Sequence, residues 1–345
     1  MGDKGLDIGT NMLVCAEVGE DGSPVFKMQR DAFYTIVPKS GVNKSAIQVA
    51  LDKQGCSYIM DGHNFIVVGE DALQTAIERN DVAKRPLRKG VISPKEKASL
   101  PMLKYLIKEL IGEGSGSDKI VYSVPAKPID ATYDIVYHTE IMNMYLRDMG
   151  YQATPLNEAY AIAYNELIED NLSGIAISWG AGMVNIAVLH QGDALVEFST
   201  TKSGDFIDMS VGNALDLSPS LIQLEKEAGV DLSNPINSNE SLTESQEVLS
   251  VKIKEAVSVY YSSVFNYTLE NIAYQLDQRK KDLPMFREPI PIVVSGGLSL
   301  AKGFVEKFGS VISRVELPFK ISDIRKAENP MQAVAGGCLL ASTIL

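Results

Sequence analysis

The sequence predicts an α/β fold with two similar lobes, because two strand–turn–strand patterns of the same kind lie far apart in a long chain. In the first pattern, residues 6–18, Asp7 and Gly9 stand at a tight turn between apolar runs. In the second, residues 174–189, a turn of small residues separates two further apolar runs. At 345 residues the chain exceeds the usual size of one domain, so two lobes are expected.

A third pattern lies at residues 291–299, where an apolar run meets Ser295-Gly296-Gly297. We expect a buried strand there, followed by a Gly-Gly turn that opens a helix over residues 302–312. The backbone at such a strand-to-helix turn is a suitable support for a flat base. The three patterns in this order predict a nucleotide bound between two facing lobes.

The first turn has the chemistry needed to hold phosphates. A glycine lets the backbone approach a phosphate oxygen, since any Cβ would collide with it. The N–H groups of the turn supply positive partial charge, and the Asp7 carboxylate can hold a hydrated Mg²⁺. Because Asp and Gly are also ordinary turn residues, this interpretation depends on the matching patterns later in the chain.

These patterns resemble the phosphate and adenosine motifs of the actin, Hsp70 and sugar-kinase superfamily, and within it the prokaryotic actins of the MreB and MamK type. Further stretches follow in the order of that family: residues 67–72 (VVGEDA), 85–92 (RPLRKGVI), 156–164 (LNEAYAIAY) and 329–338 (NPMQAVAGGC). The resemblance implies a two-lobed actin-like ATPase fold. Each lobe would be a ribonuclease H-like α/β core with a smaller outer subdomain, and the nucleotide would lie in the cleft between lobes.

The resemblance also implies where the lobes begin and end. The first lobe would have its core at residues 1–32 and 92–158 and its outer subdomain at 33–91. The second lobe would have its core at residues 159–211 and 244–345 and a small outer subdomain at 212–243. Amphipathic spacing predicts a helix over 100–111. Another helix should begin after Ser218, with Pro219 at its first position, and residues 243–276 predict one long helix or two abutting ones. Residues 333–345 predict a buried helix.

Individual site residues receive roles from the same resemblance. Asp7 would hold Mg²⁺ through water, and Glu158 would orient the attacking water, although from the residues alone Glu158 could be a surface or capping glutamate. The phosphates would be bound by Gly9, Thr10 and Asn11 of the first turn and by Gly180, Ala181, Gly182 and Met183 of the second. Adenosine would lie on Gly296, Gly297 and Leu298, with Glu225 and Lys226 within reach of the ribose or purine. The implied cofactors are ATP, or GTP, and Mg²⁺.

One position departs from the family pattern. The second phosphate turn usually begins with an aspartate, and this chain has Ser178 there, followed by its single tryptophan, Trp179, which we expect to be a packing residue. Serine is a possible metal ligand but lacks the charge that helps to place Mg²⁺ and water. Losing one such electrostatic group typically costs about 10²–10³ in rate, so we expect nucleotide binding with slow hydrolysis, and faster turnover in Ser178→Asp.

Composition excludes several classes of protein. The net charge of −12 argues against a direct nucleic-acid binder and against broad adhesion to anionic membranes. A basic cluster at residues 84–89 is the exception, either as a solvated loop or as a filament or partner contact. The three cysteines lie far apart, which favours reduced thiols and a cytoplasmic location. No apolar run reaches the ~18 residues of a membrane span, and we expect neither a signal peptide nor an intrinsic membrane anchor.

Four functions fit the resemblance unequally. The first is a nucleotide-dependent cytoskeletal protein that polymerises with itself and hydrolyses ATP slowly, with a protein adaptor as a candidate partner. An Hsp70-type chaperone is disfavoured because no peptide-binding region follows, and a small-molecule kinase because no aspartate base is evident in the first lobe. A non-polymerising actin-like scaffold, with nucleotide as a structural ligand, is the main alternative to the first.

Overall fold

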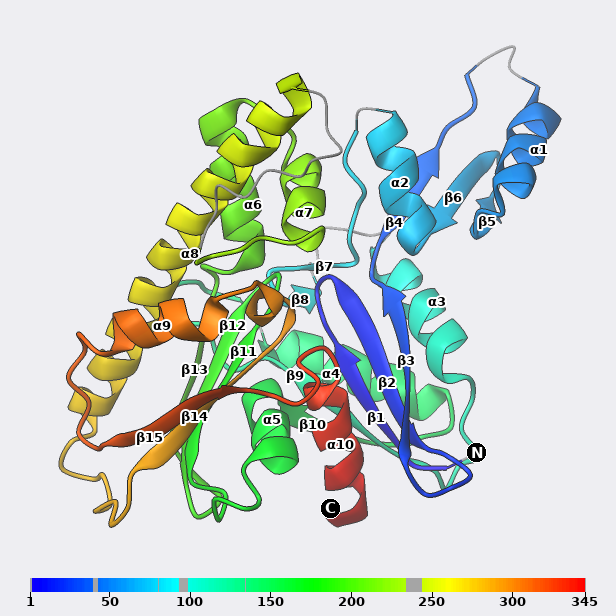
Figure 1. Ribbon diagram of the computed structural model, residues 1–345. Helices are drawn as coiled ribbons and strands as arrows, with labels where there is room; N and C mark the ends of the chain where they lie inside the picture. Colours follow the sequence, from blue (N-terminus) through cyan, green and yellow to red (C-terminus); the bar gives the residue numbers. More distant parts are fainter. Residues whose placement is uncertain are drawn as a thin grey trace.

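The computed structural model describes residues 2–39, 43–79, 81–92, 99–133, 135–233 and 244–344, and it has two lobes, each built around one five-stranded sheet (Figure 1). The first sheet contains, in spatial order, β10 (Gln152–Asn157), β9 (Lys119–Val124), β1 (Lys4–Ile8), β2 (Met12–Val18) and β3 (Pro24–Arg30). β1 pairs with β2 in antiparallel fashion, as does β2 with β3, whereas β9 and β10 run parallel to β1. The first predicted strand–turn–strand pattern is therefore the β1–β2 hairpin.

The second sheet repeats this arrangement. Its strands are, in spatial order, β13 (Asp193–Thr200), β12 (Val184–His190), β11 (Gly174–Trp179), β14 (Ile290–Ser295) and β15 (Ile321–Lys326). The first three in chain order form an antiparallel meander, and β14 and β15 add in parallel to β11. The same strand order and directions in both sheets confirm the predicted two-lobed actin-like fold with ribonuclease H-like cores.

A smaller sheet projects from the first lobe. Its strands lie in the order β4 (Phe33–Ile36), β6 (Asn64–Val68), β5 (Tyr58–Asp61), and the helices α1 (Lys44–Gln54) and α2 (Glu70–Glu78) accompany them. The short hairpin of β7 (Leu87–Arg88) and β8 (Val91–Ile92) leads the chain back to the core. These elements occupy the range expected for the outer subdomain, although the exact lobe boundaries remain predictions.

The remaining helices are α3 (Ser99–Ile111), α4 (Ile135–Asp148), α5 (Glu158–Glu166), α6 (Gly204–Leu215), α7 (Pro219–Glu227), α8 (Glu244–Gln278), α9 (Phe304–Ile312) and α10 (Ala333–Ile344). The Ser218 side chain caps α7 by accepting a hydrogen bond from the backbone N–H of Ser220, as its position before Pro219 predicts. Of the two alternatives for residues 243–276, a single helix, α8, is present. Residues 234–243, the last part of the small outer subdomain expected at 212–243, lie outside the described residues.

The Gly-Gly turn after β14 differs from the expectation. It opens one turn of 3₁₀ helix, η1 (Gly297–Leu300), and α9 begins only at Phe304. The reason is local, because Gly303 has φ of 71°, a left-handed conformation that a helix interior does not contain. Trp179 is fully buried at the end of β11, with ring centroids of Phe265, Phe304 and Phe308 at 5.3, 5.5 and 5.5 Å, so it is a packing residue as predicted.

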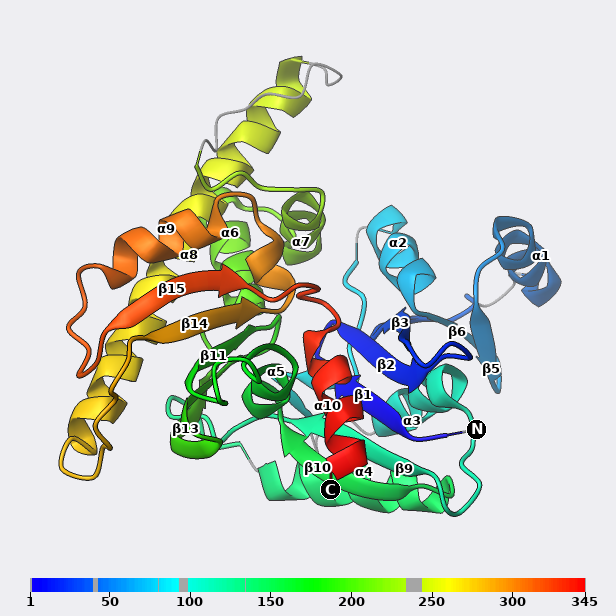
Figure 2. The ribbon, with the colours of Figure 1, turned by 60° about the horizontal axis from the view of Figure 1, so that its bottom comes forward.

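Helices α5 and α10 lie between the two sheets and join the lobes (Figures 1 and 2). Small residues allow their backbones to touch, because a Cβ on Gly337 of α10 would fall 1.8 Å from the carbonyl oxygen of Ala161 on α5. α3 and α4 cover the other face of the first sheet, and α6, α8 and α9 cover the other face of the second. Within the described ranges, no helix is both long and apolar enough to cross a membrane.

Candidate functional site

A cavity of about 910 Å³ lies between the lobes, where the turns of the two hairpins face η1 and α7. Every residue to which the sequence assigned a role lines it: Asp7, Gly9, Thr10, Asn11, Glu158, Ser178, Gly180, Ala181, Gly182, Met183, Glu225, Lys226, Gly296, Gly297 and Leu298. The fold therefore brings together residues up to almost three hundred positions apart.

The two hairpin turns touch at the floor of this cavity. A Cβ on Gly182 would lie 2.3 Å from Thr10 Oγ1 and 2.5 Å from the backbone nitrogen of Gly90, so only glycine fits. The Thr10 hydroxyl accepts a hydrogen bond from that Gly90 N–H at 2.9 Å, which ties the first turn to the β7–β8 hairpin. The side chain of Met183 is buried against Gly90 and Ser199, so only its backbone is placed to contact a phosphate.

The second turn is braced from behind by the start of α6. The N–H groups of Gly204 and Asp205 donate to the carbonyl oxygens of Gly180 and Ala181, at 3.2 and 2.8 Å. The Gly180 N–H donates to the carbonyl of Met183 at 3.0 Å and closes the turn. The turn is thus fixed in shape by backbone bonds, as a preformed phosphate cradle requires.

Two carboxylates, Asp7 and Glu158, stand at the cavity floor, where β1 ends and α5 begins. Asp7 Oδ1 accepts a hydrogen bond from Ser123 Oγ at 2.9 Å. One oxygen of Glu158, Oε2, accepts two hydrogen bonds, from Asn185 Nδ2 at 2.9 Å and from Ser178 Oγ at 3.2 Å. The Asn185 amide is itself fixed, since its Oδ1 accepts the backbone N–H of Ala126 at 2.9 Å.

Burial makes both carboxylates hard to ionise. Burial first, and then the charge of Asp7, raise the pKa of Glu158 to about 8, against the hydrogen bonds from Ser178 and Asn185. Burial likewise raises the pKa of Asp7 to about 6, against the bond from Ser123. A cation between them would relieve both, and carboxylate oxygens suit Mg²⁺, which keeps several of its waters. The residues present thus fit a hydrated Mg²⁺.

We expect these raised pKa values to make the nucleotide-free protein less stable as the pH rises. A carboxyl group whose pKa is higher in the folded than in the unfolded state stabilises the fold when the pH is below the unfolded pKa. This stabilisation is lost as the pH rises through the folded pKa. For Glu158 the window runs from about 4.5 to about 8, with a slope of at most about 1.4 kcal/mol per pH unit. Thermal unfolding of the wild type and Glu158→Gln between pH 5 and 8.5 tests this, and parallel curves for the two proteins would contradict it.

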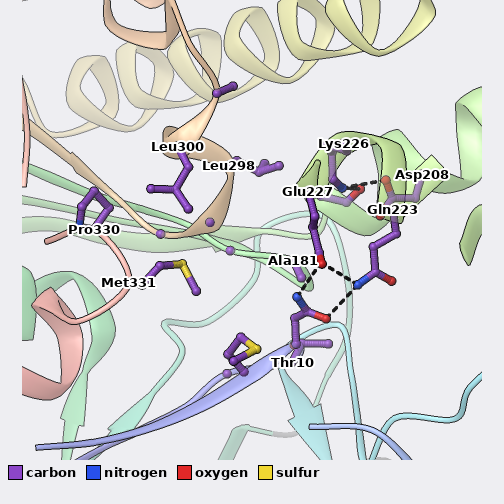
Figure 3. Close-up of a pocket in the computed structure, with 18 of the residues that line it drawn as sticks. Thr10, Ala181, Asp208, Gln223, Lys226, Glu227, Leu298, Leu300, Pro330 and Met331 are labelled. Atoms are coloured by element: carbon purple, nitrogen blue, oxygen red, sulfur yellow. Dashed lines mark hydrogen bonds and ion pairs between the residues drawn. The ribbon is translucent and has the colours of Figure 1, made fainter. Parts of the chain in front are cut away.

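The opposite end of the cavity is apolar on one wall and charged on the other (Figure 3). Leu298, Leu300, Pro330 and Met331 form the apolar wall, and the carbonyl of Pro330 accepts bonds from the Ser295 hydroxyl at 2.8 Å and the Gly296 N–H at 3.0 Å. These two bonds hold the Gly-Gly turn in place.

On the charged wall, helix α7 supplies Glu225 and Lys226. Lys226 Nζ forms an ion pair with Asp208 at 2.6 Å, and Glu225 accepts a hydrogen bond from Ser250 Oγ at 3.0 Å. The Lys226 ammonium is therefore already paired with a carboxylate, and one carboxylate oxygen of Glu225 already accepts a hydrogen bond from Ser250. Both still line the cavity, at the end where Gly296 and Gly297 lie.

Polar contacts cross the cleft beside the first turn. The Asn11 side chain bonds to two residues of α7: its Oδ1 accepts from Gln223 Nε2 at 3.0 Å, and its Nδ2 donates to Glu227 Oε1 at 3.1 Å. Arg30 at the end of β3 pairs with the same Glu227 at 2.8 Å. Asn11, predicted as a phosphate ligand, is in this conformation a link between the lobes through its side chain.

The basic cluster at residues 84–89 is divided in the structure. Lys84 and Arg88 are exposed, as a solvated loop requires. Arg85 is different and neither alternative describes it, because its guanidinium donates across the cleft to Asp205 at 2.6 Å and to Gln223 at 2.7 Å. The charge pattern of the sequence could not reveal this, since both partners lie more than one hundred positions away.

Several lining or supporting residues were not identified from the sequence as site residues: Ser123, Asn185, Gln223, Glu227, Leu300, Pro330 and Met331. Pro330 and Met331 belong to a stretch that already resembles the family, so their position next to the Gly-Gly turn could have been predicted from the sequence. The others carry no local signal.

The two lobes and the cavity between them have the actin-like fold that is also seen in MamK and MreB5. A family model described as Volactin matches residues 2–342, and the chain therefore belongs to the Volactin family. No curated protein matches the sequence.

Solved structures with this fold are distant in sequence. The MamK double helical filament is 17% identical, with 99% of this chain and 98% of that chain covered and a TM-score of 0.68. MreB5 of Spiroplasma citri bound to ADP is 15% identical over 98% and 95%, with a TM-score of 0.64. The ethanolamine utilization protein EutJ from Carboxydothermus hydrogenoformans is 15% identical over 98% and 89%, with a TM-score of 0.52. These similarities establish the fold.

Proposed function

We propose that this protein is a nucleotide-dependent actin-like cytoskeletal protein that binds ATP, or GTP, with Mg²⁺ and polymerises into filaments with slow hydrolysis. The observation that carries the proposal is the close approach of two glycine turns, one from each lobe, on the floor of one large cavity, where Gly182 of the second turn lies against the Thr10 side chain of the first. Self-association is supported by the similarity to MamK, which was solved as a double helical filament. Nucleotide binding is supported by the similarity to MreB5, which was solved with ADP and with AMPPNP. A cytoplasmic location, a possible adaptor and the absence of direct nucleic-acid contact belong to the same proposal.

Each end of the bound nucleotide would meet a different kind of surface. Backbone N–H groups of both turns would bind the phosphates, and Asp7, oriented by Ser123, would hold the hydrated Mg²⁺. Bound Mg²⁺ supplies neutralisation of the phosphate charge. The base would lie on the Gly-Gly turn against Met331, with Glu225 near the ribose or purine.

Glu158 would orient the attacking water and accept its proton. Asn185 and Ser178 both bond to Oε2, so that oxygen is held in one position and Oε1 is left for the water. Ser178 stands where the family pattern has an aspartate, and Asn185 is also neutral, so the two donors position Glu158 without adding negative charge for Mg²⁺. This is why we expect hydrolysis to be slow.

Sedimentation of the purified protein with Mg-ATP, with Mg-ADP and without nucleotide tests the proposal. Pelleting with Mg-ATP alone is the expected result. Nucleotide bound without pelleting in any condition would overturn the filament and favour the alternative, a non-polymerising scaffold with nucleotide as a structural ligand. The neutral pair of Ser178 and Asn185 is the observation that favours this alternative.

Ser178→Asp should raise the rate of hydrolysis, because an aspartate restores a charge beside Asp7 and Glu158 where Mg²⁺ and water would be placed. An increase of about tenfold or more is expected from the size of such electrostatic contributions. Without Mg²⁺ the same variant should be less stable, since the new carboxylate would face Glu158 Oε2. Phosphate release at saturating Mg-ATP is the measurement, with Ser310→Asp, at an exposed position of α9, as control. Unchanged turnover with intact binding would count against this role for position 178.

A further inference from the structure

Arg85 lies among three carboxylates that come from both lobes. Its guanidinium bonds to Asp205 and Gln223 of the second lobe, at 2.6 and 2.7 Å. The charges of Asp205, Asp208 and Asp31 all raise its pKa. Two of these aspartates belong to the second lobe, whereas Asp31 belongs to the first, as does Arg85 itself.

Asp31 is a buried acid that the proposed reaction does not use. It follows β3, its exposed fraction is 0%, and neither carboxylate oxygen accepts a hydrogen bond from the part of the chain that the structure describes. The Leu87 N–H and the Arg85 guanidinium are near enough to lower its pKa, but neither meets hydrogen-bond geometry, and burial raises the pKa well above the usual value. Buried polar groups are almost always bonded, so an orphan of this kind needs an explanation.

The position of Asp31 connects it to the candidate phosphate site. Its backbone N–H donates to the carbonyl oxygen of Asn11 at 3.0 Å, so it stands directly behind the first turn. A second cavity, of about 450 Å³, adjoins Arg85 between Leu87 and Asp205. The Arg85 side chain thus has adjoining space, a current partner across the cleft and an unpaired acid in its own lobe.

We propose that Arg85 is a two-position switch between the lobes: it binds Asp205 and Gln223 when the cleft is closed and Asp31 when the cleft is open. This deepens the proposed function, because the closed cleft is the state that would retain nucleotide. Each position of the guanidinium leaves one acid without its partner, so the two states differ by the exchange of one charged pair for another. A ligand that contacts both lobes would shift this equilibrium toward the closed state.

Substitution of the two aspartates separates a switch from simple packing, because opposite effects are expected. Asp205→Asn should speed release of N-methylanthraniloyl-ATP by about tenfold, which corresponds to about 1.4 kcal/mol. Asp31→Asn should slow release by a few fold, since the open state loses the negative charge that would pair with Arg85. Asp170→Asn is the matched control, because it breaks the pair with Arg325 inside the second lobe and should change nothing.

Arg85→Gln provides a second test by epistasis. This variant removes the charge from both positions, so it should release nucleotide faster, and adding Asp31→Asn to it should have no further effect. Faster release in Asp31→Asn alone, or an additive effect in the double variant, would overturn the switch. Melting temperatures of all variants show whether a change in release arises from loss of the fold.

A distance measurement keeps the switch testable even if no nucleotide binds. Of the three cysteines, Cys15 and Cys338 are buried and Cys56 is partly exposed, so dyes on Cys56 and on Asn213→Cys in α6 would report the separation of the lobes. Energy transfer should fall in Asp205→Asn and rise in Asp31→Asn relative to the parent. Equal transfer in all three would overturn the switch, whereas a failure to bind nucleotide would overturn only the proposed function.

Discussion

Glu158→Gln is expected to lower the rate of nucleotide hydrolysis by about 10²–10⁴-fold and to leave nucleotide binding in place. The amide keeps the size of the side chain and can still accept a bond from Asn185 or Ser178, but it cannot take a proton from water. Phosphate release in single turnovers gives the rate, and titration with a fluorescent nucleotide gives the affinity.

The matched control is Glu306→Gln, which changes an exposed glutamate of α9 in the same way. It should leave both rate and affinity unchanged. A Glu158→Gln protein with the full rate would return Glu158 to the simpler interpretation, a glutamate that favours the start of α5 by its charge. The variant is also expected to melt at a higher temperature than the wild type without nucleotide, because it removes an acid that burial disfavours.

Gly182→Ala is expected to weaken nucleotide binding by tenfold or more and to suppress nucleotide-dependent pelleting. Its Cβ would meet Thr10 Oγ1 at 2.3 Å and backbone atoms of Gly90 and Lys89 at 2.5 and 3.0 Å. Backbone cannot move aside as a flexible side chain can, so the second turn must move away from the β7–β8 hairpin and from Thr10. Overpacking of this kind typically costs about 1–3 kcal/mol. Equilibrium titration and pelleting are the measurements.

Gly309→Ala in α9 is the control for this substitution. Its Cβ would meet only Ile324 Cδ1, at 3.6 Å, which is ordinary contact. A glycine inside a helix is less favourable than alanine by roughly 0.5–1 kcal/mol, so this variant should be slightly more stable and bind nucleotide normally. If Gly182→Ala also bound normally, the contact between the two turns would not be what shapes the site.

The parts of the site that could be predicted from sequence are the local ones. A turn with Asp7 and Gly9, or a strand that ends in Gly296 and Gly297, carries its signal within a few residues, because glycine and turn chemistry act at short range. The two-lobed fold class followed from the resemblance, since the two hairpins match two phosphate motifs of that superfamily. The chemical roles of these residues remain predictions, which the experiments above address.

The links between the lobes could not be predicted in this way. Asn11 and Glu227, or Arg85 and Asp205, are joined only by the way in which the finished lobes face each other. Asp31 offered no signal either, because an aspartate between β3 and β4 is an ordinary turn residue by composition. Its exceptional feature, burial without a partner, exists only in the folded structure. Positions of this kind are where sequence reasoning fails for physical reasons.

The packing of α10 has a consequence for how the protein is made. Val14 and Ala16 of β2 are covered by Ala335 and Leu339 of α10, more than three hundred positions later in the chain. Ribosomes add about 5–20 residues per second, so this face of the first sheet would wait roughly 15–65 s for its cover. During that interval the first lobe has an open apolar surface. The early sheet is therefore the part of this protein that a chaperone would have most reason to protect while synthesis continues.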